Sequence, residues 1–295
     1  DYTLYFISSA TEAWEIVAQS LIKEKSLHLY NGAFGKKWAH YTRQIIPNAH
    51  SFEFGLNEDL KSVAPTLSTK DFDTICLVQS ETSNGTGQTI CRSDFDLKED
   101  AIITVDATST MGGINLPWLE ADVWFASVQK CIGIPAGLGV LICSPKALER
   151  AAQLNKKVHY NDVLLMEENR KLFQTHYTPN VLSIYVLNKL AHLLPNLAVI
   201  DRQTWEKASI LTDFFSNANL FHLSFLIENP HLRLPTVFAL QGETEQIKRL
   251  QNLCLKNNIE LGKGYGEWKS NTVRIANFPS HTEADIRQLI NILTL

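Results

Sequence analysis

The chain reads FASVQK at residues 125–130, where an apolar strand ends in a short polar turn that holds one lysine, Lys130. The sequence PAGLG follows at residues 135–139 and leads into a second apolar strand. Upstream, AIITVD at residues 101–106 is another apolar strand, and it ends in a carboxylate, Asp106. The chain between Asp106 and Lys130 is long enough for one crossover between parallel strands. Both charges are therefore predicted at strand ends, where open α/β sheets bind ligands.

A lysine and a carboxylate at neighbouring strand ends allow two interpretations. Pyridoxal phosphate requires a lysine amine that forms a Schiff base with it and a carboxylate that keeps its pyridine nitrogen protonated. The amine attacks well only when burial or a neighbouring cation favours its neutral form. The alternative is a buried ion pair with a structural role alone, and spacing does not decide between the two.

Composition indicates a globular protein. The chain has 295 residues, 45% of them hydrophobic and 20% charged, with a net charge of −4, so it can hold one large or two ordinary domains. It has no long basic or acidic run and no apolar stretch of about 18 residues, which argues against nucleic-acid and membrane partners. The five cysteines are scattered without a CxxC pair. Reduced thiols, a cytoplasmic location and no metal site are expected.

Apolar strands separated by predicted helices recur between residues 3 and 143. This pattern indicates a mainly parallel α/β sheet. A polar or aromatic candidate follows one strand after another, and such regularity favours a ligand site. The candidates are Ala10 and Thr11, Phe34, Thr82, Asp106, and Gln129 with Lys130.

Some candidates also have a purely structural interpretation. Ser9, Ala10 and Thr11 open a helix, whose free N–H groups favour a phosphate, but serine and threonine are also ordinary N-caps. Phe34 lies in NGAFG at residues 31–35, which reads as a turn after a strand. Its ring is either a hydrophobic plug or a surface that stacks on a flat ligand.

The pattern changes in the last third of the chain. Residues 1–195 are predicted to form a large cofactor-binding domain, including an interdomain helix at residues 181–194 that Thr178 caps with Pro179 at its first position. Residues 196–295 are predicted to form a smaller C-terminal α+β domain, with a capping box at residues 280–283 before the last helix.

Arg274 lies inside an apolar strand, where burial without a partner is costly. Strand alternation places it on a solvated face, or else it is a fork that binds a substrate carboxylate. Just upstream, GKGYG at residues 262–266 is predicted to be a flexible loop that can close over a site.

Together these motifs resemble the class V aminotransferases, pyridoxal-phosphate enzymes of fold type I. The resemblance spans nearly the whole chain and is greatest, within the class, to the phosphoserine aminotransferases. It implies a large α/β domain with a mainly parallel sheet and a smaller C-terminal α+β domain. The matching motifs, in the family's order, are SATEAW at 9–14, NGAFG at 31–35, ETSNG at 81–85, VDA at 105–107, SVQK at 127–130, PAGLG at 135–139 and TPN at 178–180.

The resemblance implies catalytic and ring-binding roles for four residues. Lys130 would form the Schiff base and move a proton between the substrate's Cα and the cofactor. Asp106 would hold the pyridine nitrogen, and Phe34 would stack on the ring in the place of an aromatic residue that is often tryptophan. Thr82 would bond the cofactor's phenolic oxygen.

The resemblance also implies how the two anionic groups are bound. Ala10, Thr11 and Gln129 would hold the cofactor's phosphate, together with Thr178 of the partner subunit, so the site implies a homodimer. Arg274 would bind the carboxylate of the amino-acid substrate.

The chain departs from the family in the part expected to read the substrate's phosphate. Family members carry more N-terminal sequence, with a Pro-Gly-Pro turn and a His-Arg pair, so we expect that sequence preceding Asp1 is missing. They also tend to have a His-Arg step before the carboxylate-binding arginine, where this chain reads GYGEWK at residues 264–269. Tyr177 replaces the usual asparagine before Thr178.

The implied reaction is amino transfer between L-glutamate and 3-phosphohydroxypyruvate in serine biosynthesis. Transamination between alanine or serine and glyoxylate is the alternative within the same chemistry. A cysteine desulfurase-like lyase would stack a histidine on the ring and carry a cysteine in a mobile loop, whereas this chain has Phe34, and Cys254 lies in an apolar helical run. A non-enzymatic relative would be expected to lose Lys130 or Asp106.

Overall fold

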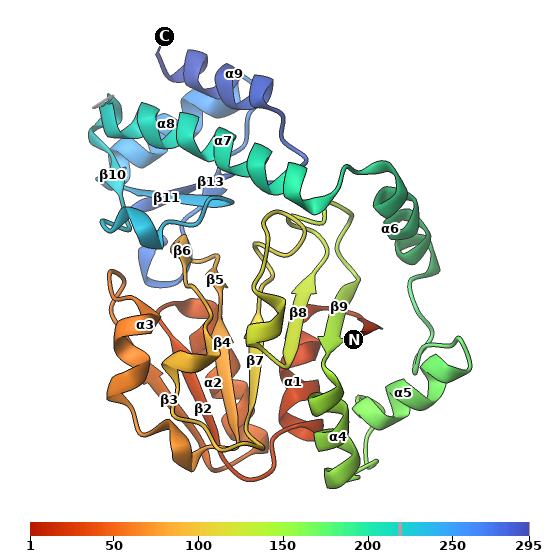
Figure 1. Ribbon diagram of the computed structural model, residues 1–295. Helices are drawn as coiled ribbons and strands as arrows, with labels where there is room; N and C mark the ends of the chain where they lie inside the picture. The colour runs from red at the N-terminus through yellow and green to blue at the C-terminus, as the bar shows by residue number, and fades with distance from the viewer. Residues whose placement is uncertain (218–219, 295) are drawn as a thin grey trace.

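The computed structural model describes residues 1–217 and 220–294, and two sheets dominate it (Figure 1). The larger sheet has seven strands in the order β1-β9-β8-β7-β4-β2-β3. These strands are β1 (Thr3–Ile7), β2 (Ser26–Tyr30), β3 (Ala49–Glu53), β4 (Thr74–Val78), β7 (Ile102–Asp106), β8 (Val123–Ser127) and β9 (Gly139–Cys143). Only β9 runs antiparallel to its neighbours, β1 and β8. The other strands therefore end at a common edge, as the sequence predicts.

Helices cover the two faces of the large sheet. On one face, Trp14 and Trp38 of α1 and α2 pack with Ala147 of α4 against the inward side chains of the strands. On the other face, α3 and the loops around Met111 and Leu116 cover a second apolar cluster. Burial on both sides explains why β4, β7 and β8 read as continuous apolar runs. The helices up to this point are α1 (Ala10–Ser20), α2 (Ala33–Ile45), α3 (Leu60–Val63) and α4 (Pro145–Leu154).

The smaller sheet lies over the carboxyl ends of the large one (Figure 1). Its strands are antiparallel in the order β10-β11-β13-β12, namely β10 (Ser224–Phe225), β11 (Val237–Gln241), β13 (Thr272–Ala276) and β12 (Gly262–Lys263). An apolar cluster joins it to α7 (Leu197–Asn217), α8 (Thr244–Lys256) and α9 (Glu283–Leu293). The short ribbon of β5 (Ser80–Glu81) and β6 (Thr86–Gly87) rises from β4 and meets this half of the molecule, where Leu234 N donates to Gly85 O at 2.9 Å.

Two helices connect the halves along the outer edge of the molecule, α5 (Val163–Lys171) and α6 (Val181–Leu193) (Figure 1). Among the described residues, no single helix is both long and apolar enough to cross a membrane. Only α6 and α7 together pass on length and composition, and they are bent by 87° relative to each other.

The mixed α/β fold with a mainly parallel large sheet is confirmed, and several local predictions are wrong. Thr178 does not cap α6, because Asn180 does so by accepting a hydrogen bond from Ser183 N. The last capping box joins Thr282 to Asp285 rather than spanning residues 280–283. Residues 31–35 are not a free turn, since α2 already begins at Ala33.

The predicted flexible loop at residues 262–266 is likewise only part loop, because Gly262 and Lys263 form β12. A strand of only two residues, one of them glycine, leaves no pattern in the sequence that would predict it. The division into domains at residues 195 and 196 stays a prediction.

Candidate active site

Lys130 lies just beyond the carboxyl end of β8. Its Nζ donates hydrogen bonds to Thr82 Oγ1 at 2.6 Å and to Ser109 Oγ at 3.1 Å. Burial removes water from the ammonium group and lowers the pKa of Lys130 to about 8, while the carboxylates of Asp106 and Glu81 oppose this shift. This shift favours the neutral, nucleophilic form of the amine.

Asp106 is the last residue of β7, the strand beside β8, and it is 4% exposed. Its Oδ1 accepts hydrogen bonds from Thr108 N at 2.9 Å and Thr108 Oγ1 at 2.5 Å, and its Oδ2 accepts from Trp14 Nε1 at 3.2 Å. Burial raises the pKa of Asp106, and these donors, together with the charge of Lys130, hold it down. The hydrogen-bond donors to Asp106 are all neutral, so the carboxylate keeps its charge and can stabilise a cation next to it.

The N-terminus of α2 places Phe34 beside Lys130. Lys130 Nζ lies 5.4 Å from the centroid of the Phe34 ring. The carboxylate of Glu81 is buried and accepts hydrogen bonds from Phe34 N and Gly35 N, each at 3.1 Å, so it satisfies two of the free donors at the helix end. Since Glu81 directly precedes Thr82, one dipeptide fixes both the aromatic ring and a hydroxyl at the lysine.

Arg274 reaches the site from β13 of the small sheet. Its Nη1 donates to the backbone oxygen of Thr82 at 2.8 Å, and its Nε donates to that of Lys263 at 2.8 Å. Burial lowers the pKa of the guanidinium. Arg274 is therefore half-buried rather than on a solvated face, and its partners are neutral backbone oxygens. Its role in binding a substrate carboxylate stays a prediction.

A cavity of about 730 Å³ opens beside these groups. Thr82, Gln129 and Lys130 line it from segments that follow β5 and β8, and Arg274 and His281 line it from the small half. The cavity is large enough for an amino acid next to the lysine, and its two walls come from different halves of the chain.

The predicted phosphate-binding residues lie at the start of α1 and after β8. Ser9 caps α1 by accepting a hydrogen bond from Glu12 N. Ala10 is buried, and its N–H donates to Ser127 Oγ at 2.8 Å, so this donor already has a partner. The side chains of Thr11 and Gln129 are exposed. Their residue types and their place at strand ends suit a phosphate, and the assignment stays a prediction.

The structure does not bring Thr178 to Lys130 within this chain. Thr178 is exposed in the segment between α5 and α6, at the outer edge of the molecule (Figure 1). Its predicted contact with phosphate therefore requires a second subunit.

Sequence reasoning overlooked the supporting residues of the site. Ser109 accepts from Lys130, Trp14 donates to Asp106, and Glu81 holds the start of α2. Glu81 could have been identified, because a carboxylate directly after a buried strand needs donors. Ser109 and Trp14 carry no such signal, since serine in a turn and tryptophan in an apolar helix are ordinary.

Comparisons with known proteins identify the family of this chain. The family model for Aminotransferase class-V matches residues 1–289. A phosphoserine aminotransferase of Rhodococcus opacus is 28% identical over 293 residues, which cover 95% of this chain and 75% of the relative. The crystal structure of a phosphoserine aminotransferase from Cytophaga hutchinsonii is 31% identical, with a TM-score of 0.90, covering 99% of this chain and 82% of that one.

A third likeness concerns the fold alone. A phosphoserine aminotransferase of Trichomonas vaginalis, whose crystal structure contains bound pyridoxal phosphate, is 17% identical with a TM-score of 0.83, and the match covers 100% of this chain and 82% of that one.

The residues of this chain fit the cofactor that the family uses. A lysine amine with a lowered pKa suits the aldehyde of pyridoxal phosphate, and a buried carboxylate held by neutral donors suits a protonated pyridine nitrogen. An aromatic ring stands next to the amine. With a family model matched over almost the whole sequence, the chain belongs to the class V aminotransferases, and pyridoxal phosphate is its cofactor.

Proposed function

We propose that this chain transfers an amino group between L-glutamate and 3-phosphohydroxypyruvate, which would make it the phosphoserine-forming enzyme of serine biosynthesis. The relatives from Rhodococcus and Cytophaga, which carry the name phosphoserine aminotransferase, support the choice of substrate. The observation that carries amino transfer is the pairing of a Lys130 amine of lowered pKa with a fixed, buried Asp106 at neighbouring strand ends.

Each residue at the lysine has a role in this proposal. When bound, pyridoxal phosphate supplies an electron sink that lowers the barrier to removing the Cα proton of an amino acid. Asp106 would keep the pyridine nitrogen protonated, and Phe34 would hold the ring flat. Lys130 Nζ would move the proton to and from Cα, with Thr82 and Ser109 orienting the amine between transfers.

The remaining residues would bind the anionic groups. Ala10, Thr11 and Gln129 would hold the cofactor's phosphate at the start of α1. Arg274 would bind the α-carboxylate of the substrate with donors that now contact backbone oxygens. Amino acids and 2-oxo acids are accordingly the substrates.

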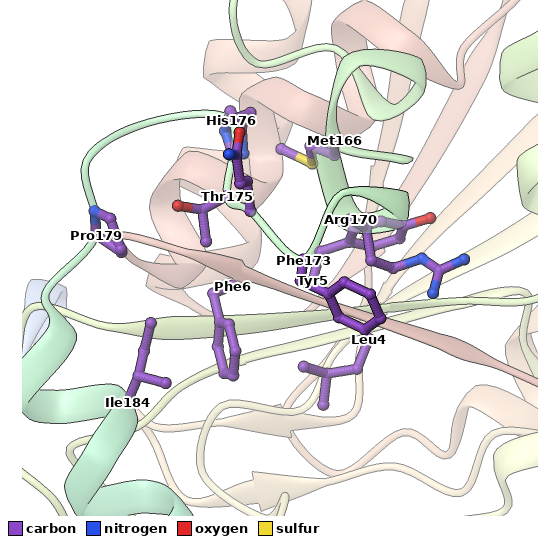
Figure 2. Close-up of a pocket in the computed structure, with 11 residues that line it drawn as sticks. Leu4, Tyr5, Phe6, Met166, Arg170, Phe173, Thr175, His176, Pro179 and Ile184 are labelled. Carbon is purple, nitrogen blue, oxygen red and sulfur yellow. The ribbon is translucent and has the colours of Figure 1, made fainter. Parts of the chain in front are cut away.

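The protein would act as a homodimer. An apolar groove of about 580 Å³ lies between β1 and the α5–α6 segment, away from Lys130, and Figure 2 shows Phe6 and Ile184 facing into it. Phe173 at its rim is 100% exposed, and such an apolar surface favours a protein partner. Thr178 precedes α6 beside this groove, and in this proposal it binds the cofactor phosphate of the partner subunit. We infer a cytoplasmic location from the free thiols of all five cysteines.

The test compares two amino acceptors on the protein loaded with pyridoxal phosphate. We expect kcat/KM for 3-phosphohydroxypyruvate, with L-glutamate as donor, to exceed that for glyoxylate by about tenfold or more. A preference for glyoxylate would instead identify an alanine– or serine–glyoxylate enzyme. Lys130→Ala should abolish the borohydride-reducible link to the cofactor, whereas Lys156→Ala, a partly buried lysine elsewhere, should retain it.

A further inference from the structure

Tyr265 connects the small half of the molecule to the first turns of α2. It follows β12 and precedes the 3₁₀ turn Gly266–Trp268. Its ring stacks on Phe34, with centroids 5.0 Å apart and an interplanar angle of 17°. Its hydroxyl accepts a hydrogen bond from Lys37 Nζ at 2.6 Å. The loop thus reaches the same aromatic ring that lies beside Lys130.

Two glycines hold Tyr265 in this position. A Cβ added at Gly264 would lie 2.3 Å from the backbone oxygen of Trp268, so the chain passes too close for any side chain there. Gly266 has a φ of +60°, in the left-handed region that glycine adopts without strain. The backbone of this loop therefore requires glycine on both sides of Tyr265.

Two cations flank the Tyr265 ring. Lys37 Nζ lies 5.0 Å from its centroid, and Arg274 Cζ lies 5.7 Å from it. Lys37 also shares the Phe34 ring with Lys130, since the two Nζ atoms lie 5.9 Å and 5.4 Å from its centroid. Lys37, Arg274 and Lys130 therefore surround one pair of stacked rings.

Neither Lys37 nor Arg274 has an acidic partner within residues 1–217 and 220–294. Lys37 donates to a phenol, and Arg274 donates to two backbone oxygens. The adjacent Lys36, by contrast, pairs with Glu53 at 3.3 Å. Glu81 is the buried acid nearby, and backbone donors already occupy its oxygens. Two positive charges without an acidic partner therefore lie around the Tyr265 ring, and an anionic ligand would stabilise both of them.

We propose that Lys37 and the Tyr265 hydroxyl form a subsite for the distal anionic group of the substrate. The ligand class is an amino or 2-oxo acid with a second anion, either a carboxylate or a phosphate. Its α-carboxylate goes to Arg274 and its distal anion goes to Lys37, which can exchange the phenol for an ionic partner. This inference rests on the proposed amino transfer, and it gives both half-reactions the same distal subsite.

The experiment titrates dicarboxylate and monocarboxylate probes into the protein loaded with pyridoxal phosphate. Glutarate carries a distal carboxylate and butyrate does not. In Lys37→Gln we expect calorimetry to show glutarate binding about tenfold more weakly, while butyrate binding is unchanged. Tyr265→Phe should weaken glutarate binding by about threefold, because only one hydroxyl is lost. Lys36→Gln is the matched control, and it should leave the binding of both probes unchanged.

Steady-state rates give an independent readout. Lys37→Gln should raise KM for L-phosphoserine and L-glutamate with little change in kcat. In single turnovers without an acceptor, it should leave the rate of the half-reaction with L-alanine unchanged, because alanine has no distal anion. If Lys37→Gln weakens the binding of glutarate and butyrate equally, or weakens neither, the proposed subsite is wrong. A wild-type protein without transaminase activity would overturn the proposed function instead, and the calorimetric comparison would still decide on Lys37.

Discussion

The side-chain hydroxyl of Thr82 accepts a hydrogen bond from the Lys130 amine at 2.6 Å. This hydroxyl also bonds Ser109, which itself accepts from the lysine, so the amine rests on two linked oxygens. The contact joins the segment after β4 to the turn after β8, across the intervening strand β7. The position of the amine therefore depends on the register of three parallel strands rather than on its own loop.

The titration of Lys130 is the first prediction. In the cofactor-free protein, the rate at which an acylating reagent modifies Lys130 should rise with pH through a midpoint near 8, because burial disfavours the ammonium form. Asp106→Asn should move that midpoint lower, since the Asp106 carboxylate raises the pKa of Lys130. Peptide mass spectrometry across a pH series measures both. A midpoint near the ordinary lysine value of 10.5 would contradict the burial of this amine.

Glu81 should influence both stability and the lysine. Glu81→Gln replaces a charged acceptor at the start of α2 by a weaker one, and we expect a loss of about 1–2 kcal/mol in the free energy of unfolding. The same change should lower the pKa of Lys130, because the Glu81 charge raises it. Glu53→Gln, which breaks an exposed pair with Lys36, is the control and should cost under about 1 kcal/mol. Denaturant titration and the acylation series separate the two effects, and an unshifted lysine midpoint would refute the electrostatic part.

Gly264 should be intolerant of a side chain. In Gly264→Ala the new Cβ meets the Trp268 backbone oxygen, so the loop must shift and carry Tyr265 off Phe34. We expect KM for L-glutamate to rise by about tenfold with a smaller effect on stability. Gly55→Ala is a suitable control, because the nearest atoms to its Cβ belong to the flexible side chain of Glu58. Equal kinetic constants in Gly264→Ala and the wild type would argue against a fixed loop.

Acid sensitivity should depend on His28. This side chain is buried against Trp38, its ring nitrogens have no hydrogen-bond partner among the described residues, and burial lowers its pKa to about 3. The unfolded chain takes up a proton near the ordinary value of 6.5, whereas the folded chain does not, so stability should fall as the pH drops from 6.5 towards 3. The slope from this residue approaches about 1.4 kcal/mol per pH unit. His28→Leu should remove that contribution, as urea titrations at pH 7 and pH 5 would show.

The strand ends were predictable from the sequence, and the contacts across the cavity were not. Buried parallel strands read as continuous apolar runs, so Asp106 and Lys130 could be placed at the ends of adjacent strands. NGAFG looked like a turn because the acceptor that lets α2 begin at Ala33 is Glu81, from another part of the chain. The stack of Tyr265 on Phe34 depends on how two sheets dock, and no local pattern encodes it. The role of Thr178 follows from the resemblance alone, because no local pattern in one chain encodes a contact with a second subunit.

Arg274 donates with one nitrogen to the backbone oxygen of Thr82, which follows β5, and with another to that of Lys263 in the small sheet. The guanidinium therefore links the two walls of the cavity through hydrogen bonds. An incoming carboxylate that competes for those nitrogens would weaken this link between the walls as it binds. Occupancy and the angle between the walls are then coupled, so crystals grown with and without a dicarboxylate should differ in the relative orientation of the two halves more than in the internal structure of either half.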